Sequence, residues 1–209
     1  MPRPVARHGS RLAAWAVAAW AVLFSGCAAS PPPAPVSASA GPLPRVALLP
    51  LENLSGRPEC GDLLTRICEA ALARTGKCQT VEPGDIQGAM AEARVRTTGL
   101  LTSEQAVQLA GRLRARYLLA GTILECGRVR TPEGEVPSVG IALRLLMGDS
   151  AQVVWTAMKV RTGDDRETIF GWGREPSLER LAERTVAEMF ESFRLPAGSR
   201  EPAAAGGTP

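Results

Sequence analysis

Apolar residues recur along the chain at spacings that predict its strands. Residues 45–51 (RVALLPL) form a nearly continuous apolar run, which is typical of a strand buried on both faces, and Pro50 marks its end. Residues 116–124 (RYLLAGTIL) predict a second buried strand, and residues 79–82 predict a short strand between these two.

Residues 139–147 alternate between apolar side chains and others, which predicts a strand with a distinct inner face. A Gly-Asp-Ser turn at 148–150 leads into a further strand over residues 152–160. We expect these two strands to form a hairpin, because the turn between them is tight.

Four segments carry apolar residues at helical spacing. The first two are residues 61–75, which end before a glycine, and residues 85–96. The third begins after Thr102, where Thr-Ser-Glu-Gln fits a capping box, and the fourth begins after Ser177 with the clearest apolar stripe in the chain. The resulting order is β-α-β-α-α-β-β-β-α. Because helices separate the early strands and a hairpin follows, the sequence predicts an α/β fold, a mixed sheet with helices packed against it.

The first 26 residues have the composition of a secretory signal peptide. Three arginines precede an apolar run at 12–24, and small residues close the run before Cys27. Residues 12–26 would span about 22 Å as a helix, which is less than the roughly 30 Å of a bilayer core. A retained membrane helix is therefore the weaker alternative.

The stretch LFSGC at 23–27 resembles a bacterial lipoprotein box. The resemblance implies cleavage before Cys27 and lipid attachment to its sulfur. Because no Asp follows Cys27, it also implies the outer membrane as destination, with the domain facing the periplasm. Each buried CH₂ of an acyl chain contributes about 0.8 kcal/mol, so several chains give a stable anchor.

Composition separates a linker and a tail from the folded part. Residues 27–44 begin with the lipidated cysteine and carry six prolines with little to bury, so we expect a spacer. Its length is at most about 50 Å. Residues 196–209 are rich in Ala, Gly, Pro and Ser and predict a disordered tail. The folded domain is then residues 45–195.

Charge and histidine content narrow the classes of function. Three of the 24 basic residues lie in the signal peptide, so the mature chain would carry 21 basic and 21 acidic side chains. This balance removes the usual electrostatic argument for nucleic-acid binding. The only histidine is His8, so a mature chain would have no His-dependent catalysis and no His-ligated metal site. We therefore expect no enzyme activity, cofactor or metal site, while carboxylate-only chemistry stays open.

Four stretches of the chain form a recognisable pattern: RVALLPLENLSG at 45–56, LRARYLLAGTILE at 113–125, IALRLLMGDSAQVVW at 141–155 and GWGREPSLERLAERTVAEMFESF at 171–193. Together they resemble the CsgG/LpoB-like family of bacterial lipoprotein domains, which includes a curli secretion lipoprotein and a penicillin-binding-protein activator. The resemblance implies an α/β periplasmic domain that binds other proteins or assembles with copies of itself.

A secretion channel of the CsgG kind would need additional membrane-spanning hairpins. Each transmembrane strand takes about 9–11 residues with an apolar outward face. The segment at 125–138 is polar and too short for such a hairpin, so we expect no pore.

Four cysteines remain besides Cys27, and an oxidising compartment favours disulfides between them. If the strands at 45–51 and 116–124 run parallel, Cys60 and Cys126 both lie beyond the carboxyl edge of the sheet. Cys68 and Cys78 would then pair across the end of the first helix. The alternative is one disulfide with two buried thiols. Zinc binding is disfavoured because no CxxC spacing is present.

Two short segments are candidates for partner contact. The first follows the strand at 45–51, at the edge that ligands favour in α/β sheets, and the second places a tryptophan, a frequent hot-spot residue, between two glycines. The alternatives are a turn that enters the next helix and a tryptophan folded onto the last helix. The candidate residues are Glu52, Asn53, Leu54, Ser55 and Gly56 in the first segment, and Gly171, Trp172 and Gly173 in the second.

These observations predict a non-enzymatic outer-membrane lipoprotein whose periplasmic domain binds an envelope protein, for example a peptidoglycan synthase, or copies of itself. The alternative is a ring-forming or accessory subunit of a secretion or envelope assembly of the CsgG type, without its own membrane barrel.

Overall fold

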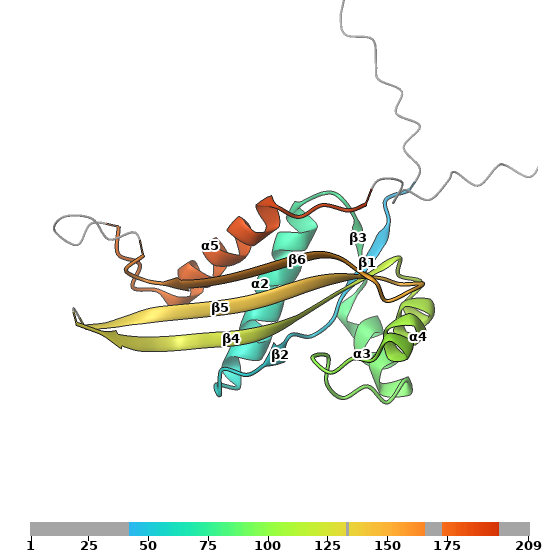
Figure 1. Ribbon diagram of the computed structural model, residues 1–209, viewed down its shortest axis with the longest axis horizontal. Helices are drawn as coiled ribbons and strands as arrows, with labels where there is room; N and C mark the ends of the chain where they lie inside the picture. The colour runs from blue at the N-terminus through green and yellow to red at the C-terminus, as the bar shows by residue number, and fades with distance from the viewer. Residues whose placement is uncertain (1–41, 133, 166–172, 197–209) are drawn as a thin grey trace, which may run out of the picture. The chain divides into compact units, whose positions relative to one another are not determined.

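The computed structural model of this chain describes residues 42–132, 134–165 and 173–196 (Figure 1). Within them, six strands form one mixed sheet and four α-helices pack against its two faces. The predicted fold class is confirmed, and the order of elements gains one short strand, β2. In chain order the elements are β1 (Arg45–Leu48), β2 (Glu52–Asn53), α2 (Glu59–Arg74), β3 (Gln79–Thr80), α3 (Pro83–Glu92), α4 (Ser103–Leu113), β4 (Tyr117–Thr131), β5 (Gly134–Met147), β6 (Val153–Thr162) and α5 (Leu178–Glu191).

The sheet is parallel on one side and antiparallel on the other. Its strand order is β3-β1-β4-β5-β6, with β2 pairing separately with β4. β1 pairs in parallel with β3 and β4, whereas β4, β5 and β6 form an antiparallel run. Parallel neighbours need crossover connections, and α2, α3 and α4 lie in these connections. The antiparallel strands need only turns, as predicted for β5 and β6.

The first predicted strand is interrupted, and part of the predicted loop is a strand. β1 ends at Leu48, and β2 begins at Glu52. Leu48 lies opposite Leu119 and Glu52 lies opposite Thr122. The segment from β1 to β2 therefore has one residue more than the stretch of β4 with which it pairs. Pro50 falls within the extra turn, where its missing N–H interrupts the ladder. The prediction of one strand over 45–51 followed by a loop was therefore wrong.

The β4–β5 hairpin is longer than predicted. The prediction ended one strand at residue 124 and began the next at residue 139, but pairing continues to Thr131 opposite Gly134. Several side chains of the added part are charged and exposed, including Arg128, Arg130 and Glu135. Backbone pairing continues there although the apolar pattern stops, which is why the sequence pattern missed it.

Successive residues of the sheet point to opposite faces and meet different helices. On one face, α2 and α5 cover residues such as Val46 and Leu119. On the other face, α3 and α4 cover Ala47 and Leu118. In Figure 1, α2 lies behind the long strands, so the viewer looks at the face on which α3 and α4 pack. These two helices are packed near β1 and the start of β4, which leaves the distal part of β4, β5 and β6 without a helix on this face.

The helix ends follow local side-chain chemistry. The capping box of α4 is confirmed, because the Thr102 hydroxyl accepts a hydrogen bond from the Gln105 N–H (3.2 Å) and the Gln105 side chain accepts one from the Thr102 N–H (3.1 Å). The Ser177 hydroxyl caps α5 as predicted. α3 ends at Glu92, four residues before the predicted end, and Arg94 beyond it has a left-handed backbone with φ of 55°.

Candidate protein-contact surface

Asn53 organises the turn that carries the first candidate segment. Its Oδ1 accepts hydrogen bonds from the Ser55 N–H (3.1 Å) and the Ser55 hydroxyl (2.7 Å), and its Nδ2 donates to the Arg57 carbonyl (2.6 Å). Gly56 has φ of 76°, in the left-handed region that favours glycine. These three candidate residues hold the turn into α2, and their contact with a partner stays a prediction.

Leu54 and Glu52 are the two candidates that do not hold the turn. The Leu54 side chain is exposed, and the Glu52 side chain contacts the neighbouring loop. Leu54 is 62% exposed, although its N–H donates to the Ile123 carbonyl (3.0 Å). The Glu52 carboxylate lies against Gly99 in the loop between α3 and α4, where a Cβ on Gly99 would overlap it. The same loop is held by the buried Thr98 hydroxyl, which donates to the Pro50 carbonyl (2.6 Å). The β1–β2 interruption and this loop are thus joined into one surface.

A disulfide fixes the adjoining end of α2. It joins Cys60, in the first turn of α2, to Cys126 of β4, with Cα atoms 6.3 Å apart. This is the pairing expected for cysteines beyond the carboxyl edge of parallel strands. It fixes the helix that follows the 52–56 turn to the long hairpin.

The second predicted disulfide is absent, and Cys68 and Cys78 are free buried thiols. Burial raises the pKa of Cys68 to about 12 and that of Cys78 to about 11, so both thiols are protonated at neutral pH. The pairing across the helix end was therefore wrong.

The second candidate segment lies mostly outside the described residues, which include neither Gly171 nor Trp172. Gly173 is described and has φ of 93°. Just after it, the buried Glu175 carboxylate accepts a hydrogen bond from Arg184 of α5 (3.0 Å) and one from the Ser177 N–H (3.1 Å). The start of α5 is therefore anchored where this segment ends.

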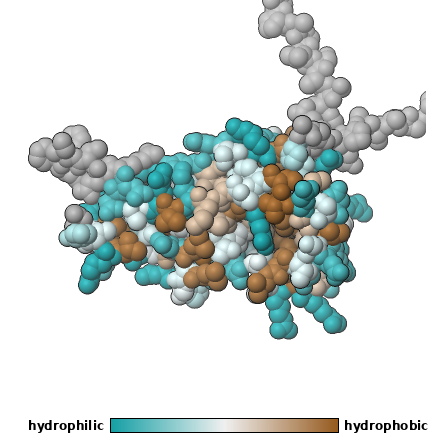
Figure 2. Space-filling view, in the orientation of Figure 1, coloured by the Kyte–Doolittle hydropathy of each residue, from teal (hydrophilic) through white to brown (hydrophobic). Residues whose placement is uncertain are grey.

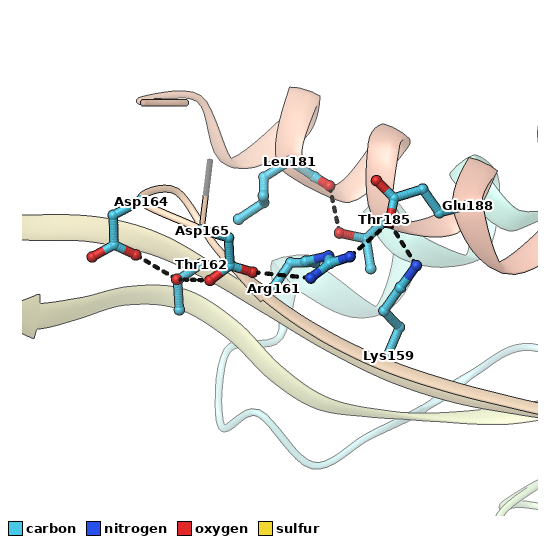
Figure 3. Close-up of polar contacts among 8 residues, drawn as sticks. All are labelled: Lys159, Arg161, Thr162, Asp164, Asp165, Leu181, Thr185 and Glu188. Atoms are coloured by element: carbon cyan, nitrogen blue, oxygen red, sulfur yellow. Dashed lines mark hydrogen bonds and ion pairs between the residues drawn. The ribbon is translucent and has the colours of Figure 1, made fainter. Parts of the chain in front are cut away.

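An ion-pair cluster lies between β6 and α5, and the sequence analysis did not predict it. Glu188 accepts hydrogen bonds from Lys159 (2.6 Å) and Arg161 (3.1 Å), and Arg161 also pairs with Asp165 at 3.5 Å (Figure 3). The Lys159 hydrogen bond, followed by that of Arg161, lowers the Glu188 pKa to about 2 against the effect of its burial.

The alternation along β6 is the signal that would have located this cluster. Trp155 and Ala157 face the core under α5, so Lys159 and Arg161 at the same two-residue spacing must also face α5. Two cations under a helix require an acidic residue above them, and Glu188 supplies it. The cluster fastens α5 to the edge strand and leaves the other face of β6 open.

That open face carries exposed apolar side chains. The sheet residues under α3 and α4 include Ala120 and Leu146, but further along the strands the same face has no helix over it. Met158 of β6 is 67% exposed there, and Leu100 of the α3–α4 loop is 81% exposed. Figure 2 shows hydrophobic and neutral residues gathered across the middle of this face, with hydrophilic residues around them.

The described residues contain no group of three or more His, Cys, Asp or Glu side chains placed to hold a metal ion. Of the helices in residues 42–132, 134–165 and 173–196, none combines the length and the apolar character that crossing a membrane requires.

Comparisons with known proteins identify the fold. No family model matches the chain. No curated protein matches it either. Among solved structures, lipoprotein GNA1162 from Neisseria meningitidis aligns at 13% identity, covering 71% of this chain and 99% of that chain, with a TM-score of 0.51. The PelC dodecamer from Paraburkholderia phytofirmans aligns at 21% identity over 75% of this chain and 96% of that chain, with a TM-score of 0.49.

The C-terminal domain of LpoB from Escherichia coli also aligns, at 17% identity over 60% of this chain and 85% of that chain. Its TM-score of 0.43, like that of PelC, is too low to carry an argument. The CsgG part of the sequence resemblance finds no support among these structures. The chain therefore shares its fold with lipoprotein GNA1162, and this similarity extends to the fold alone.

Proposed function

We propose that this chain is an outer-membrane lipoprotein without catalytic activity, whose periplasmic domain binds another protein of the cell envelope. The observation that carries the proposal is the exposed apolar surface on the β4–β6 face (Figure 2), on which Met158 is 67% exposed. Gathered exposed apolar side chains on a folded domain mark interaction sites. A peptidoglycan synthase is one partner of this kind, as the sequence resemblance implies.

The N-terminal segment supports the proposed anchor. Cleavage before Cys27 would leave a lipidated first residue, and the proline-rich segment at 28–44 would separate the membrane from the domain at 45–195. In support of this division, the first described strand, β1, begins at Arg45, and the last described helix, α5, ends at Glu191. GNA1162, which has the same fold, is itself described as a lipoprotein.

Fractionation of cells tests the anchor. The wild-type chain is expected in the outer-membrane fraction with covalently bound acyl chains, and a Cys27→Ala variant is expected without them. Equal lipid labelling of the two proteins would contradict the assignment of Cys27.

Cross-linking in living cells tests partner binding. The full chain is expected to yield an adduct with an envelope protein that mass spectrometry identifies. Recovery of no protein adduct, at a cross-linker concentration that captures a known envelope complex in the same cells, would refute the proposal.

Self-assembly is the second candidate, and one observation favours it. β6 pairs only with β5 among the described strands, so its outer edge is open, and Val153 and Val160 on it are exposed. The native mass of the detergent-extracted protein separates the two candidates. A ring or dimer of this chain alone would favour self-assembly over binding to a different protein.

A further inference from the structure

A hollow of about 370 Å³ opens on the uncovered face of the sheet, where the layer formed by α3 and α4 ends. The α3–α4 loop borders it on one side, and β6 borders it on the other. Its lining includes Gly99, Thr122, Ala142, Arg144, Thr156 and Met158. The volume is within the range of about 300–1,000 Å³ that is usual for ligand pockets.

The pairing register explains why the hollow forms at this place. Ala142 of β5 lies opposite Thr122 of β4 and opposite Met158 of β6, so these three residues form one row across the sheet. With strands about 4.8 Å apart, the row is about 10 Å wide. The central Ala142 is small, whereas Met158 is long, so the floor of the row is lower than its border.

Arg144 is the one charged side chain among the residues that line the hollow. Its Nη2 donates a hydrogen bond to the Gly99 carbonyl (3.2 Å), which holds the guanidinium at the wall formed by the α3–α4 loop. Glu52 lies against the same glycine. In the part of the chain that the structure describes, however, Arg144 forms no ion pair with Glu52 or with any other carboxylate. An arginine held in place with most of its donors unused is suited to binding a carboxylate in a bidentate manner.

From this geometry we infer that the hollow receives a segment of the partner protein in which an apolar side chain stands beside an Asp or Glu. The apolar side chain would fill the space over Ala142, against Met158, and the carboxylate would bind Arg144. This inference rests on the proposed function, because it names the chemistry of the partner that the same surface binds. Charge complementarity selects the occupant, since a basic or purely apolar segment would leave the guanidinium buried and unpaired.

A photo-reactive amino acid placed at position 158 of the full chain tests the inference in living cells. We expect an adduct with an envelope protein, and we expect the cross-linked peptide to carry an Asp or Glu within a few residues of an apolar side chain. The control position is 66, because Arg66 is exposed on α2, which covers the opposite face of the sheet. Little or no adduct is expected there.

Charge variants then test the role of Arg144. Arg144→Glu should lower the yield of the adduct at position 158 by about tenfold or more, because like charges would meet. Arg144→Lys should retain only part of the yield, because it keeps the positive charge but not the two parallel hydrogen bonds. The matched control is Arg66→Glu, which reverses the charge of another arginine whose side chain donates to a backbone carbonyl, and it should leave the yield unchanged.

A second variant tests whether a loss of adduct reflects the hollow itself and not unfolding of the domain. Ala142→Phe fills the hollow without removing Arg144 and should lower the yield to the same extent. Both variants are compared with the wild-type chain in thermal unfolding, so that a loss of adduct in a folded variant reports the surface itself.

The outcomes separate the inference from the proposed function. An adduct with a second copy of the chain or with lipid overturns the inference, as does an adduct that Arg144→Glu and Ala142→Phe both leave intact. A partner captured at position 66 but not at position 158 also overturns it, while the proposed function stands. Absence of any protein adduct at either position removes the proposed function together with the inference.

Discussion

The disulfide between Cys60 and Cys126 makes a large and measurable contribution to stability. The two cysteines are 66 residues apart. In the chain-entropy model, closing a loop of this length lowers the entropy of the unfolded chain by an amount worth about 4 kcal/mol at 25 °C. Reduction of the bond is therefore expected to lower the free energy of unfolding by about 4 kcal/mol, with the folded structure unchanged. With a urea m value of about 2 kcal/mol/M, the unfolding midpoint falls by about 2 M.

Urea unfolding of a soluble variant that lacks residues 1–27 measures this effect, with and without a phosphine reductant. The chain supplies a matched control, because Cys68 lies on the same helix, is fully buried and carries no bond. Cys68→Ala removes a sulfur atom without removing a cross-link, so it should cost about 1 kcal/mol. A midpoint shift on reduction no larger than that of this control would refute the entropic argument.

Counting thiols in the unfolded state checks the assignment itself. The oxidised protein should react with a thiol reagent at two positions in urea, Cys68 and Cys78, and at neither of them while folded, because both are buried. Four reactive thiols in urea without reductant would show that Cys60 and Cys126 are not joined, and none would show that the other two are.

Three further predictions concern charge, pH and packing. The Lys159 hydrogen bond lowers the pKa of Glu188 from 4.5 to about 2, so Glu188→Gln should lose about 1 kcal/mol in urea unfolding at pH 7. This loss should fade as the pH falls from about 4.5 toward 2, because protonation removes the same ion pairs from the wild type; a pH-independent loss would contradict it. Burial raises the pKa of Cys68 and Cys78 above 9.0, so stability should fall above about pH 9 by up to ~1.4 kcal/mol per pH unit per thiol, since only the unfolded thiols ionise. A variant with alanine at both positions should lose this slope. Gly121→Ala should lower stability by about 2 kcal/mol or more in thermal unfolding, because a Cβ would lie 2.5 Å from the nearest atom of β5, and an unchanged melting temperature would refute this.

The control for the packing prediction is a glycine with open space around it. A Cβ on Gly111 of α4 would have no neighbour within 4 Å. Gly111→Ala is therefore expected to raise stability by about 0.5–1 kcal/mol, since alanine favours the helix interior.

The sequence predicted those parts of the fold in which the spacing of apolar residues and a local signal, such as a helix cap, indicate the same element. The apolar stripe after Ser177 and the capping box at Thr102 located α5 and α4 with the correct first turns. Alternation predicted β5 and β6 near the core, but not the outer part of the hairpin, where side chains are polar and only the backbone pairs. Pro50 was correctly associated with the end of the first strand, but β2 depends on pairing with a strand about 70 residues away, which no local pattern reports.

The contact surface was less accessible to sequence reasoning than the fold. Leu54 was included among the candidates and is exposed, but Gly99 and Met158, which line one hollow, belong to distant parts of the chain. The role of Arg144 could not be predicted either. Its place in the hollow depends on the strand register and on its hydrogen bond to the Gly99 carbonyl, which the local sequence does not reveal. The charges of β6 that face α5 differ in this respect, because their two-residue spacing from Trp155 and Ala157 could have located them.

The order of the cysteines along the chain has a consequence for biogenesis. In a chain that is exported with its N-terminus first, as proposed, Cys60 emerges before Cys68 and Cys78, and its native partner Cys126 emerges last. An oxidase that acts on cysteines as they appear would therefore join Cys60 to a wrong neighbour first. Formation of the native bond then requires either delayed oxidation or a disulfide isomerase. Once the core closes, the burial of Cys68 and Cys78 removes both competitors, so folding itself secures the correct pairing.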